Sequence, residues 1–194
     1  MSVIQTARAS QITAHEASIC DRLGSQPHPN IAEYLGVQVS DKLNCAVGLV
    51  FKRYDCTLRE LVTRRQKFDM RLCLQFVFVA IQYLHKLGIV YGDLKPHNIF
   101  VKRGAKDHSV IEDFDSAHDT GSVITLKTGD PRWSRRKRVG EDVAEEDDDW
   151  SRFRKLTEWL VGERGGETGG LQGYWEDSED IIILNTRNRV MEYL

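Results

Sequence analysis

The segment that most constrains the fold runs from residue 70 to residue 114, where a long apolar helix pattern leads into a polar loop and a β-hairpin pattern. Asp69 is suited to cap a helix over 70–87, and apolar residues lie nearly all round this helix, so we expect it inside the core. The loop VYGDLKPHNIF follows Gly88. The runs NIFV and SVIEDF, separated by KRGAKD, then predict two paired strands.

The loop carries side chains suited to metal and phosphate chemistry. Asp93 and Asn98 share it, and Asp113 ends the second predicted strand, so one hairpin can bring the three together. Carboxylate and amide oxygens suit Mg²⁺, which usually takes few ligands from protein and completes its shell with phosphates and water. The remaining carboxylate can orient or deprotonate a hydroxyl, while Lys95 supplies positive charge for a phosphoryl group. A plain surface turn, with Asn98 as a cap and Lys95 in solvent, is the competing interpretation.

Shorter patterns predict the remaining elements. Thr13 and Glu16 fit a capping box for a helix over 13–23, and Pro27 and Pro29 follow its end. The other predicted elements are a hairpin of 34–39 with 45–51, a short helix at 57–66, an amphipathic helix at 150–161, a flexible glycine-rich loop at 162–173 and a strand or helix at 180–185.

Length and charge narrow the class of protein. The chain has 194 residues, which favours a single domain, and its 27 Lys+Arg against 29 Asp+Glu create no general field for nucleic acid or an anionic membrane. The basic cluster 135–138 and the acidic run 141–149 are expected to be solvated or paired with each other. The four cysteines lack CxxC spacing, so we expect a reduced, soluble, intracellular protein, in the cytoplasm.

Several motifs together resemble those of eukaryotic protein kinases. YGDLKPHNIF with IEDFDSA is similar to the catalytic loop H-R-D-L-x-x-x-N and the metal-binding D-F-G of that family. The link after the regulatory helix is resembled by GSQPHPNIAEYLGV, and the strand and hinge that hold adenine are resembled by GLVFKRYD. The end of the activation segment is similar to TGDPRW, and the start of the central helix of the large lobe is similar to DDWSRF. The resemblance covers about residues 12 to 161, and its lysine is the serine/threonine-type variant.

The resemblance implies an α+β, protein kinase-like fold. Its helical large lobe would dominate, and the small lobe would be reduced to one helix and about two strands. The chain would be one incomplete domain, 1–194, with a residual small lobe and hinge over about 1–53, a large lobe over about 54–161 and a loop-rich tail over 162–194.

The resemblance also implies roles for single residues, with ATP and Mg²⁺ as cofactors. Asp93 would be the catalytic base and Lys95 the contact to the γ-phosphate, while Asn98 and Asp113 would bind Mg²⁺. Glu16 would be the ion-pairing glutamate of the regulatory helix. The hinge that holds adenine would be formed by Phe51, Lys52 and Arg53. The loop would be supported by Tyr91, Phe114 and Asp148.

The chain also departs from the family pattern. No lysine precedes Lys42 and no glycine precedes Gly24, so the sequence shows neither the lysine that pairs with the regulatory glutamate nor the glycine-rich loop. Tyr91 and Gly92 stand where the family has histidine and arginine, and Asp115 replaces the glycine of D-F-G. Each lost charge-stabilising group can lower the rate roughly 10²–10³-fold, so we expect weak or absent activity.

Three functions remain open from the sequence. The first is a serine/threonine protein kinase acting on a protein substrate, and the second is a pseudokinase that binds a partner protein. The third is a small-molecule phosphotransferase of the aminoglycoside or choline kinase type, whose motifs Gly92 and Asp115 resemble. The sequence leaves the oligomeric state open.

Overall fold

The computed structural model describes residues 3–40, 42, 45–133 and 137–163. The chain divides into two compact units, Met1–Leu156 and Thr157–Leu194, and every residue predicted for the site belongs to the first. The strand or helix predicted at 180–185 and nearly all of the predicted glycine-rich loop lie outside the described residues.

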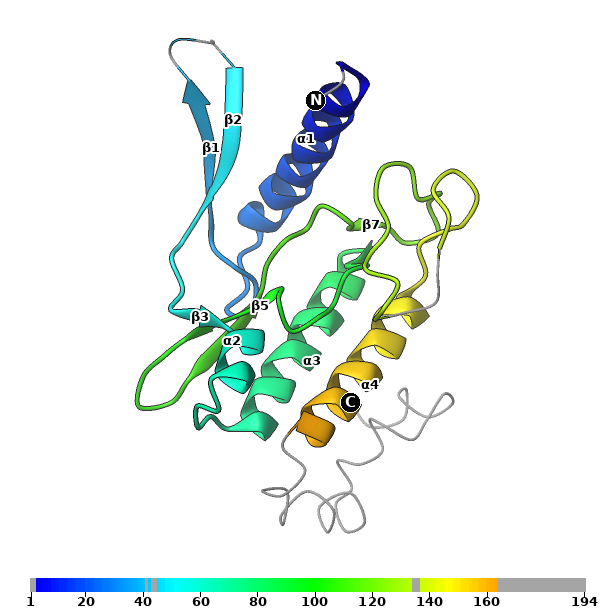
Figure 1. Cartoon of the computed structure of the whole chain (residues 1–194). Coiled ribbons are helices and arrows are strands. Elements are labelled where there is room, and N and C mark those ends of the chain that lie inside the picture. The colour runs from blue at the N-terminus through cyan, green and yellow to red at the C-terminus, as the bar shows by residue number, and fades with distance from the viewer. Residues whose placement is uncertain (1–2, 41, 43–44, 134–136, 164–194) are drawn as a thin grey trace. The chain divides into compact units, whose positions relative to one another are not determined.

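Helix α1, Val3–Ser25, is longer than the helix predicted at 13–23 (Figure 1). The predicted capping box is wrong, because Thr13 lies inside the helix, where its hydroxyl donates to the Ala9 carbonyl at 3.2 Å. The side chains of Ile19, Cys20 and Leu23 on this helix are buried. Glu16 is therefore free of a capping role and can project toward other elements.

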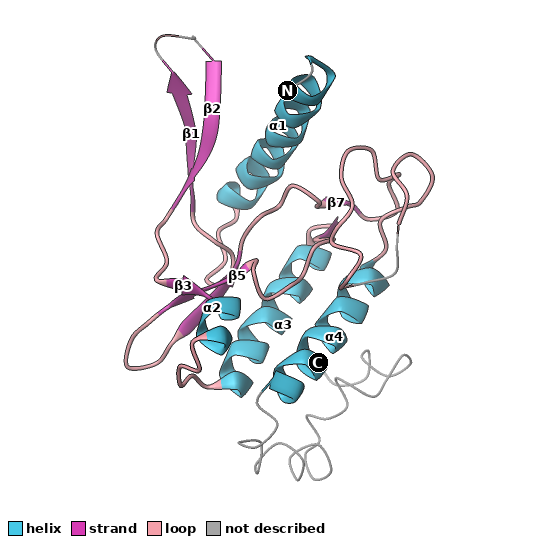
Figure 2. Cartoon of the chain, viewed as in Figure 1, coloured by secondary structure: helices cyan, strands magenta, loops and turns pink. Residues whose placement is uncertain are grey.

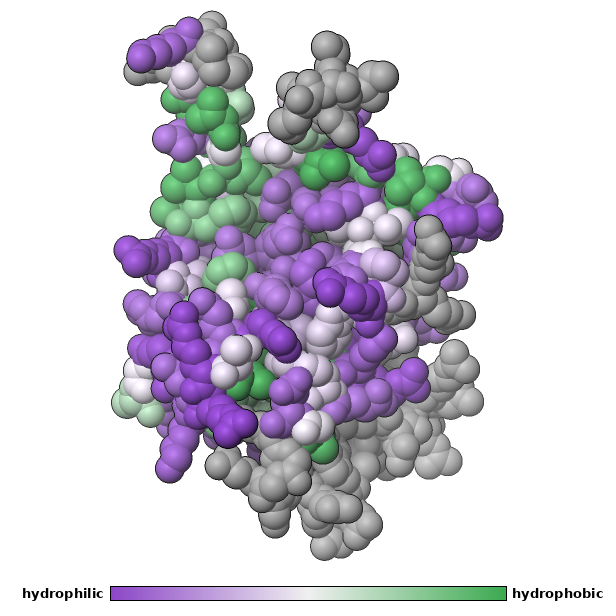
Figure 3. Space-filling view, viewed as in Figure 1, coloured by the Kyte–Doolittle hydropathy of each residue, from purple (hydrophilic) through white to green (hydrophobic). Residues whose placement is uncertain are grey.

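Strands β1, Tyr34–Ser40, and β2, Cys45–Phe51, form the predicted antiparallel hairpin. Among the described residues they make a separate two-stranded sheet. Several of their apolar side chains face solvent, with Leu35 and Val39 each 59% exposed, and this surface appears as the green region over the hairpin in Figure 3. Two strands alone bury little apolar surface, so packing against α1 contributes to holding the hairpin.

Two helices follow the hairpin and build the core. Helix α2, Leu58–Thr63, begins at a capping box in which Thr57 and Glu60 satisfy each other's backbone N–H groups. Helix α3, Met70–Lys86, begins at Asp69, whose carboxylate accepts the Leu72 N–H at 2.9 Å, as predicted. The buried side chains of α3 confirm it as a core helix, and they are Cys73, Leu74, Val77, Ala80, Ile81 and Leu84.

The predicted hairpin after the loop is confirmed as β5, Ile99–Lys102, and β6, His108–Ile111. Strand β3, Cys56–Thr57, joins them in a three-stranded sheet of order β3-β5-β6 that packs on α3. Two short strands, β4, Ile89–Val90, and β7, His118–Asp119, pair antiparallel in a two-stranded sheet of their own. The candidate loop therefore runs from β4 to β5, anchored at both ends by paired strands (Figure 2).

Helix α4, Glu146–Glu163, begins earlier than the helix predicted at 150–161. Its first turn holds Glu146, Asp147, Asp148 and Asp149, and negative charge at a helix N-terminus is favourable. Trp150 places its ring 5.2 Å from the Phe78 ring of α3. None of the helices in the described ranges is long and apolar enough to cross a membrane.

Candidate active site

The loop between β4 and β5 brings the predicted residues Asp93, Lys95 and Asn98 together. The Lys95 Nζ atom lies 2.5 Å from Asp93 Oδ2. The Asn98 amide donates to the Asp93 carbonyl at 3.1 Å and to its Oδ2 at 3.3 Å. Asp93 is only 1% exposed, so these contacts replace water around its carboxylate. The Asp93 carboxylate, the Lys95 ammonium group and the Asn98 amide are thus held in one preorganised group.

Asp113, directly after β6, reaches the same place. The Glu112 N–H donates to the Asn98 carbonyl at 3.0 Å, which ties the end of β6 to the loop. Asp113 has a φ of 68°, in the left-handed region that few residues other than glycine adopt. Strained backbone of this kind is concentrated at functional sites.

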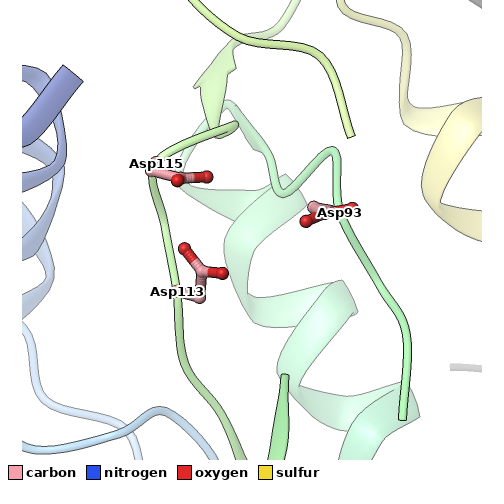
Figure 4. A group of neighbouring side chains, drawn as sticks. All are labelled: Asp93, Asp113 and Asp115. Atoms are coloured by element: carbon pink, nitrogen blue, oxygen red, sulfur yellow. The ribbon is translucent and has the colours of Figure 1, made fainter. Parts of the chain in front are cut away.

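Three carboxylates converge here, one more than the sequence analysis proposed. Figure 4 shows the side chains of Asp93, Asp113 and Asp115 pointing into one space from two separate segments. One oxygen from each lies within 4.8 Å of the others, a spacing suited to a shared cation. Asp115 was noted in the sequence as a replacement for glycine and as a likeness to small-molecule phosphotransferases, but it was not predicted as a site residue.

The electrostatics of this cluster favour a positive partner. Burial and the Asp115 carboxylate raise the pKa of Asp113 from 3.8 to about 6, against the opposing charges of Lys127 and Lys95. Burial, followed by Asp113 and Asp115, raises the pKa of Glu16 from 4.5 to about 7. A divalent cation would relieve this repulsion, because the charged form of each carboxylate would then gain an opposite charge.

The loop backbone is held by Asp149, and not by Asp148 as predicted. The two Asp149 carboxylate oxygens accept the backbone N–H groups of Tyr91 and Gly92, each at 2.8 Å. Asp148 instead pairs with Lys137 at 3.0 Å and accepts the Glu145 N–H at 3.3 Å. Successive helix residues point about 100° apart, so only one aspartate of this acidic run can face the loop. The prediction was wrong by one residue.

Tyr91 and Phe114 link the loop to α1. The buried Tyr91 hydroxyl donates to the Glu112 carbonyl, and its ring meets the Phe114 ring edge-on, with centroids 5.5 Å apart. Phe114 is fully buried, and its backbone N–H donates to Glu16 Oε1 at 3.2 Å. Glu16 therefore reaches the segment that follows β6 directly from α1.

A cavity of about 640 Å³ lies beside this cluster. It is bounded by α1, the segment 27–34, β6, Lys52 and Tyr54, and Phe114 lines it on the side of the carboxylates. Of the three residues predicted to hold adenine, Lys52 lines the cavity and pairs with Glu33 at 2.7 Å. Phe51 packs on Tyr34 with ring centroids 5.5 Å apart, and Arg53 is exposed. Neither of these two lines the cavity.

The segment after β7 returns to the loop, which the sequence analysis did not foresee. The Asp130 N–H donates to Asp93 Oδ1 at 2.6 Å. Lys127 pairs with the Asp115 carboxylate. These contacts join residues 12 to 37 positions apart, and no local pattern in the sequence indicates them.

The buried hydroxyl of Tyr34 is the other unforeseen group. It has no hydrogen-bond partner among the described residues, and Tyr34 lines the cavity. An unpaired buried hydroxyl is costly, so a ligand or water in the cavity would be a favourable partner.

Comparison with known proteins agrees with this geometry. The family model for the protein kinase domain matches residues 2–156. A serine/threonine-protein kinase US3 homolog of varicella-zoster virus is 27% identical over 96% of this chain and 48% of its own length. Serine/threonine-protein kinase WAG1 of Arabidopsis thaliana is 40% identical over 31% of this chain and 14% of its own length. The chain thus spans about half, or less, of the curated relatives it matches.

A solved structure supports the fold. The crystal structure of the yeast RNA polymerase II CTD kinase CTDK-1 complex superimposes with a TM-score of 0.63, at 21% identity, over 78% of this chain and 50% of that chain. The α+β, kinase-like fold predicted from the sequence is confirmed, including the small number of strands that precede the loop. The chain belongs to the protein kinase domain family.

Proposed function

We propose that this chain binds ATP with Mg²⁺ and transfers the γ-phosphoryl group to a serine or threonine hydroxyl of a protein. The observation that carries the proposal is the convergence of Asp93, Lys95 and Asn98 with Asp113. The relatives named serine/threonine-protein kinases support the acceptor class.

Asp93 is the proposed base. Its carboxylate is oriented by Lys95 and Asn98 to accept the proton of an acceptor hydroxyl that reaches it. Lys95, whose side chain is 17% exposed, lies where it can balance the charge of the transferring group.

The donor set suits Mg²⁺, which prefers oxygen ligands and keeps part of its water shell. Asn98 and Asp113 would hold the ion, and Asp115 offers a further carboxylate. When bound, the ion would neutralise charge on the phosphate oxygens. The cavity beside Phe114 has the volume and apolar lining expected of a site for a nucleotide base.

The expected activity of this chain is weak. Asp93 is 1% exposed and its Oδ1 atom accepts the Asp130 N–H, so the segment around Asp130 has to move before an acceptor hydroxyl reaches the base.

The buried base also favours a second function, in which the domain binds a partner protein without catalysis. The apolar surface of the β1–β2 hairpin, which includes Leu35 and Val39, offers area for such a contact. A measurement of phosphoryl transfer distinguishes the two functions, because only the first predicts transfer.

The test is phosphoryl transfer by the full chain from γ-labelled ATP. Casein and myelin basic protein serve as protein acceptors, and choline and kanamycin as small acceptors, each with Mg²⁺ or with EDTA. The proposal predicts Mg²⁺-dependent labelling of serine or threonine, slower than the roughly 1–100 s⁻¹ of ordinary kinases. Asp93→Asn should lower it about 10²-fold or more, since general-base catalysis typically contributes that much.

Three results would count against the proposal. Equal labelling by Asp93→Asn would mean that Asp93 is not the base. Labelling of choline or kanamycin alone would point to a small-molecule phosphotransferase. Binding of Mg²⁺-ADP with no transfer to any acceptor would favour the interaction module.

A further inference from the structure

The site gathers more negative than positive charge. Asp93, Asp113 and Asp115 share one space, and Glu16 approaches through its bond to the Phe114 N–H. Lys95, the proposed contact of the transferring group, pairs with Asp93 at 2.5 Å. An anionic nucleotide needs a further cation here, in addition to its metal, for its phosphates to be held against these carboxylates.

Lys127 is the cation that the fold brings to this position. Its ammonium group pairs with the Asp115 carboxylate, and it lies within electrostatic reach of Asp93 and Asp113. It also acts on Glu16, across from α1. Its side chain is 36% exposed, so Lys127 is not sealed inside the core.

The backbone around Lys127 is tied to the site on both sides. On one side the Arg8 guanidinium, from α1, donates to the Leu126 carbonyl at 3.0 Å. On the other side the Asp130 N–H donates to Asp93 Oδ1 at 2.6 Å. Lys127 thus sits between two anchors, and its placement does not depend on its own side-chain contact alone.

We propose that Lys127, positioned by Asp115, binds the phosphates of the nucleotide in this chain. A lysine ammonium is a compact charge with three donors, suited to phosphate oxygens. The proposal rests on the proposed function, because it assumes that a Mg²⁺-nucleotide binds at the carboxylates. It assigns phosphate binding to the segment after β7, which the sequence analysis did not connect with the site.

Binding measurements on the full chain test the assignment. Isothermal titration compares Mg²⁺-ADP with adenosine, which lacks phosphates, for the wild type and for Lys127→Met, Lys127→Arg and Lys106→Met. Lys106 is an exposed lysine of the β5–β6 turn and provides the matched control. Thermal unfolding of each variant checks that it is folded.

Lys127→Met should weaken Mg²⁺-ADP about 10- to 100-fold, the range expected when a hydrogen bond to a charged group is lost. Adenosine should bind it as it binds the wild type, and Lys106→Met should bind both ligands normally. Lys127→Arg should recover most of the affinity for Mg²⁺-ADP, because it keeps the charge.

Two outcomes would overturn the assignment and leave the proposed function standing. Unchanged binding of Mg²⁺-ADP by Lys127→Met would mean that Lys127 does not contact the phosphates. Tighter binding by Lys127→Met would mean that Lys127 competes with the metal for the carboxylates. A wild-type chain that binds no Mg²⁺-ADP would instead refute the proposed function, and the assignment with it.

Discussion

Asp149 Oδ1 accepts a hydrogen bond from the Gly92 N–H at 2.8 Å, across a separation of 57 residues. The second oxygen of the same carboxylate accepts the Tyr91 N–H, and His85 approaches it at 2.9 Å. Because the Asp149 side chain is fully buried, no water can replace these contacts. One side chain of α4 thereby fixes the backbone immediately before Asp93.

Asp149→Asn should therefore destabilise the fold. An amide offers one acceptor oxygen in place of two, so one backbone N–H is left unsatisfied in a buried place. The expected loss is about 2–4 kcal/mol in the free energy of unfolding, measured by urea denaturation. Asp147→Asn, at an exposed position of the same turn, should change it by less than about 0.5 kcal/mol. A larger loss from Asp148→Asn than from Asp149→Asn would contradict the assignment of Asp149.

Gly92→Ala should destabilise more than Gly121→Ala. The two glycines have nearly the same φ, 79° and 77°. A Cβ at Gly92 would lie 2.5 Å from the Ser116 carbonyl oxygen, whereas a Cβ at Gly121 would meet nothing within 4 Å. The Gly121 variant measures backbone strain alone, about 1 kcal/mol, and the Gly92 variant adds a backbone clash. Equal losses in the free energy of unfolding would show that the Ser116 contact does not constrain the loop.

The order of elements around the site could be predicted from the sequence, because each rests on a local pattern. The Asp69 cap, the apolar run of α3 and the β5–β6 hairpin depend on neighbouring residues only, and all three are confirmed. Asp93, Lys95 and Asn98 come together because one short loop contains them.

What could not be predicted depends on helix rotation or on distant contacts. Asp148 and Asp149 are chemically identical neighbours, and only the rotation of α4 decides which one faces the loop. Thr13 fits a capping pattern, yet the helix extends well before it to Val3. Lys127 follows β7 in a stretch without a helix or named strand, so neither periodicity nor spacing indicates its contact with Asp115.

The stability of the chain should depend on pH through Glu16. Its pKa rises from 4.5 to about 7 on folding, so the folded state binds the proton more tightly and stability falls as pH rises through this interval. Glu16→Gln should reduce the fall in melting temperature between about pH 5 and about pH 8, and should be more stable than the wild type at the upper end. Its amide oxygen can still accept the Phe114 N–H.

Two other glutamates help to interpret this pH dependence, one as a control variant and one as a second source of the slope. Glu158→Gln, at an exposed position, should keep the wild-type slope. Burial also raises the pKa of Glu112 to about 7, so part of the slope should persist in Glu16→Gln. A slope identical to that of the wild type in Glu16→Gln would show that Glu16 is charged at neutral pH in the folded chain.

The most direct test of the account is the Mg²⁺ dependence of ADP binding by the wild type and by Asp113→Asn. Asparagine tolerates the left-handed backbone at this position, so the variant removes the charge and keeps the geometry. The account predicts that the wild type binds ADP with Mg²⁺ and loses affinity in EDTA, and that Asp113→Asn binds about 10-fold or more weakly. Equal affinities with Mg²⁺ and EDTA, unchanged in Asp113→Asn, would contradict it.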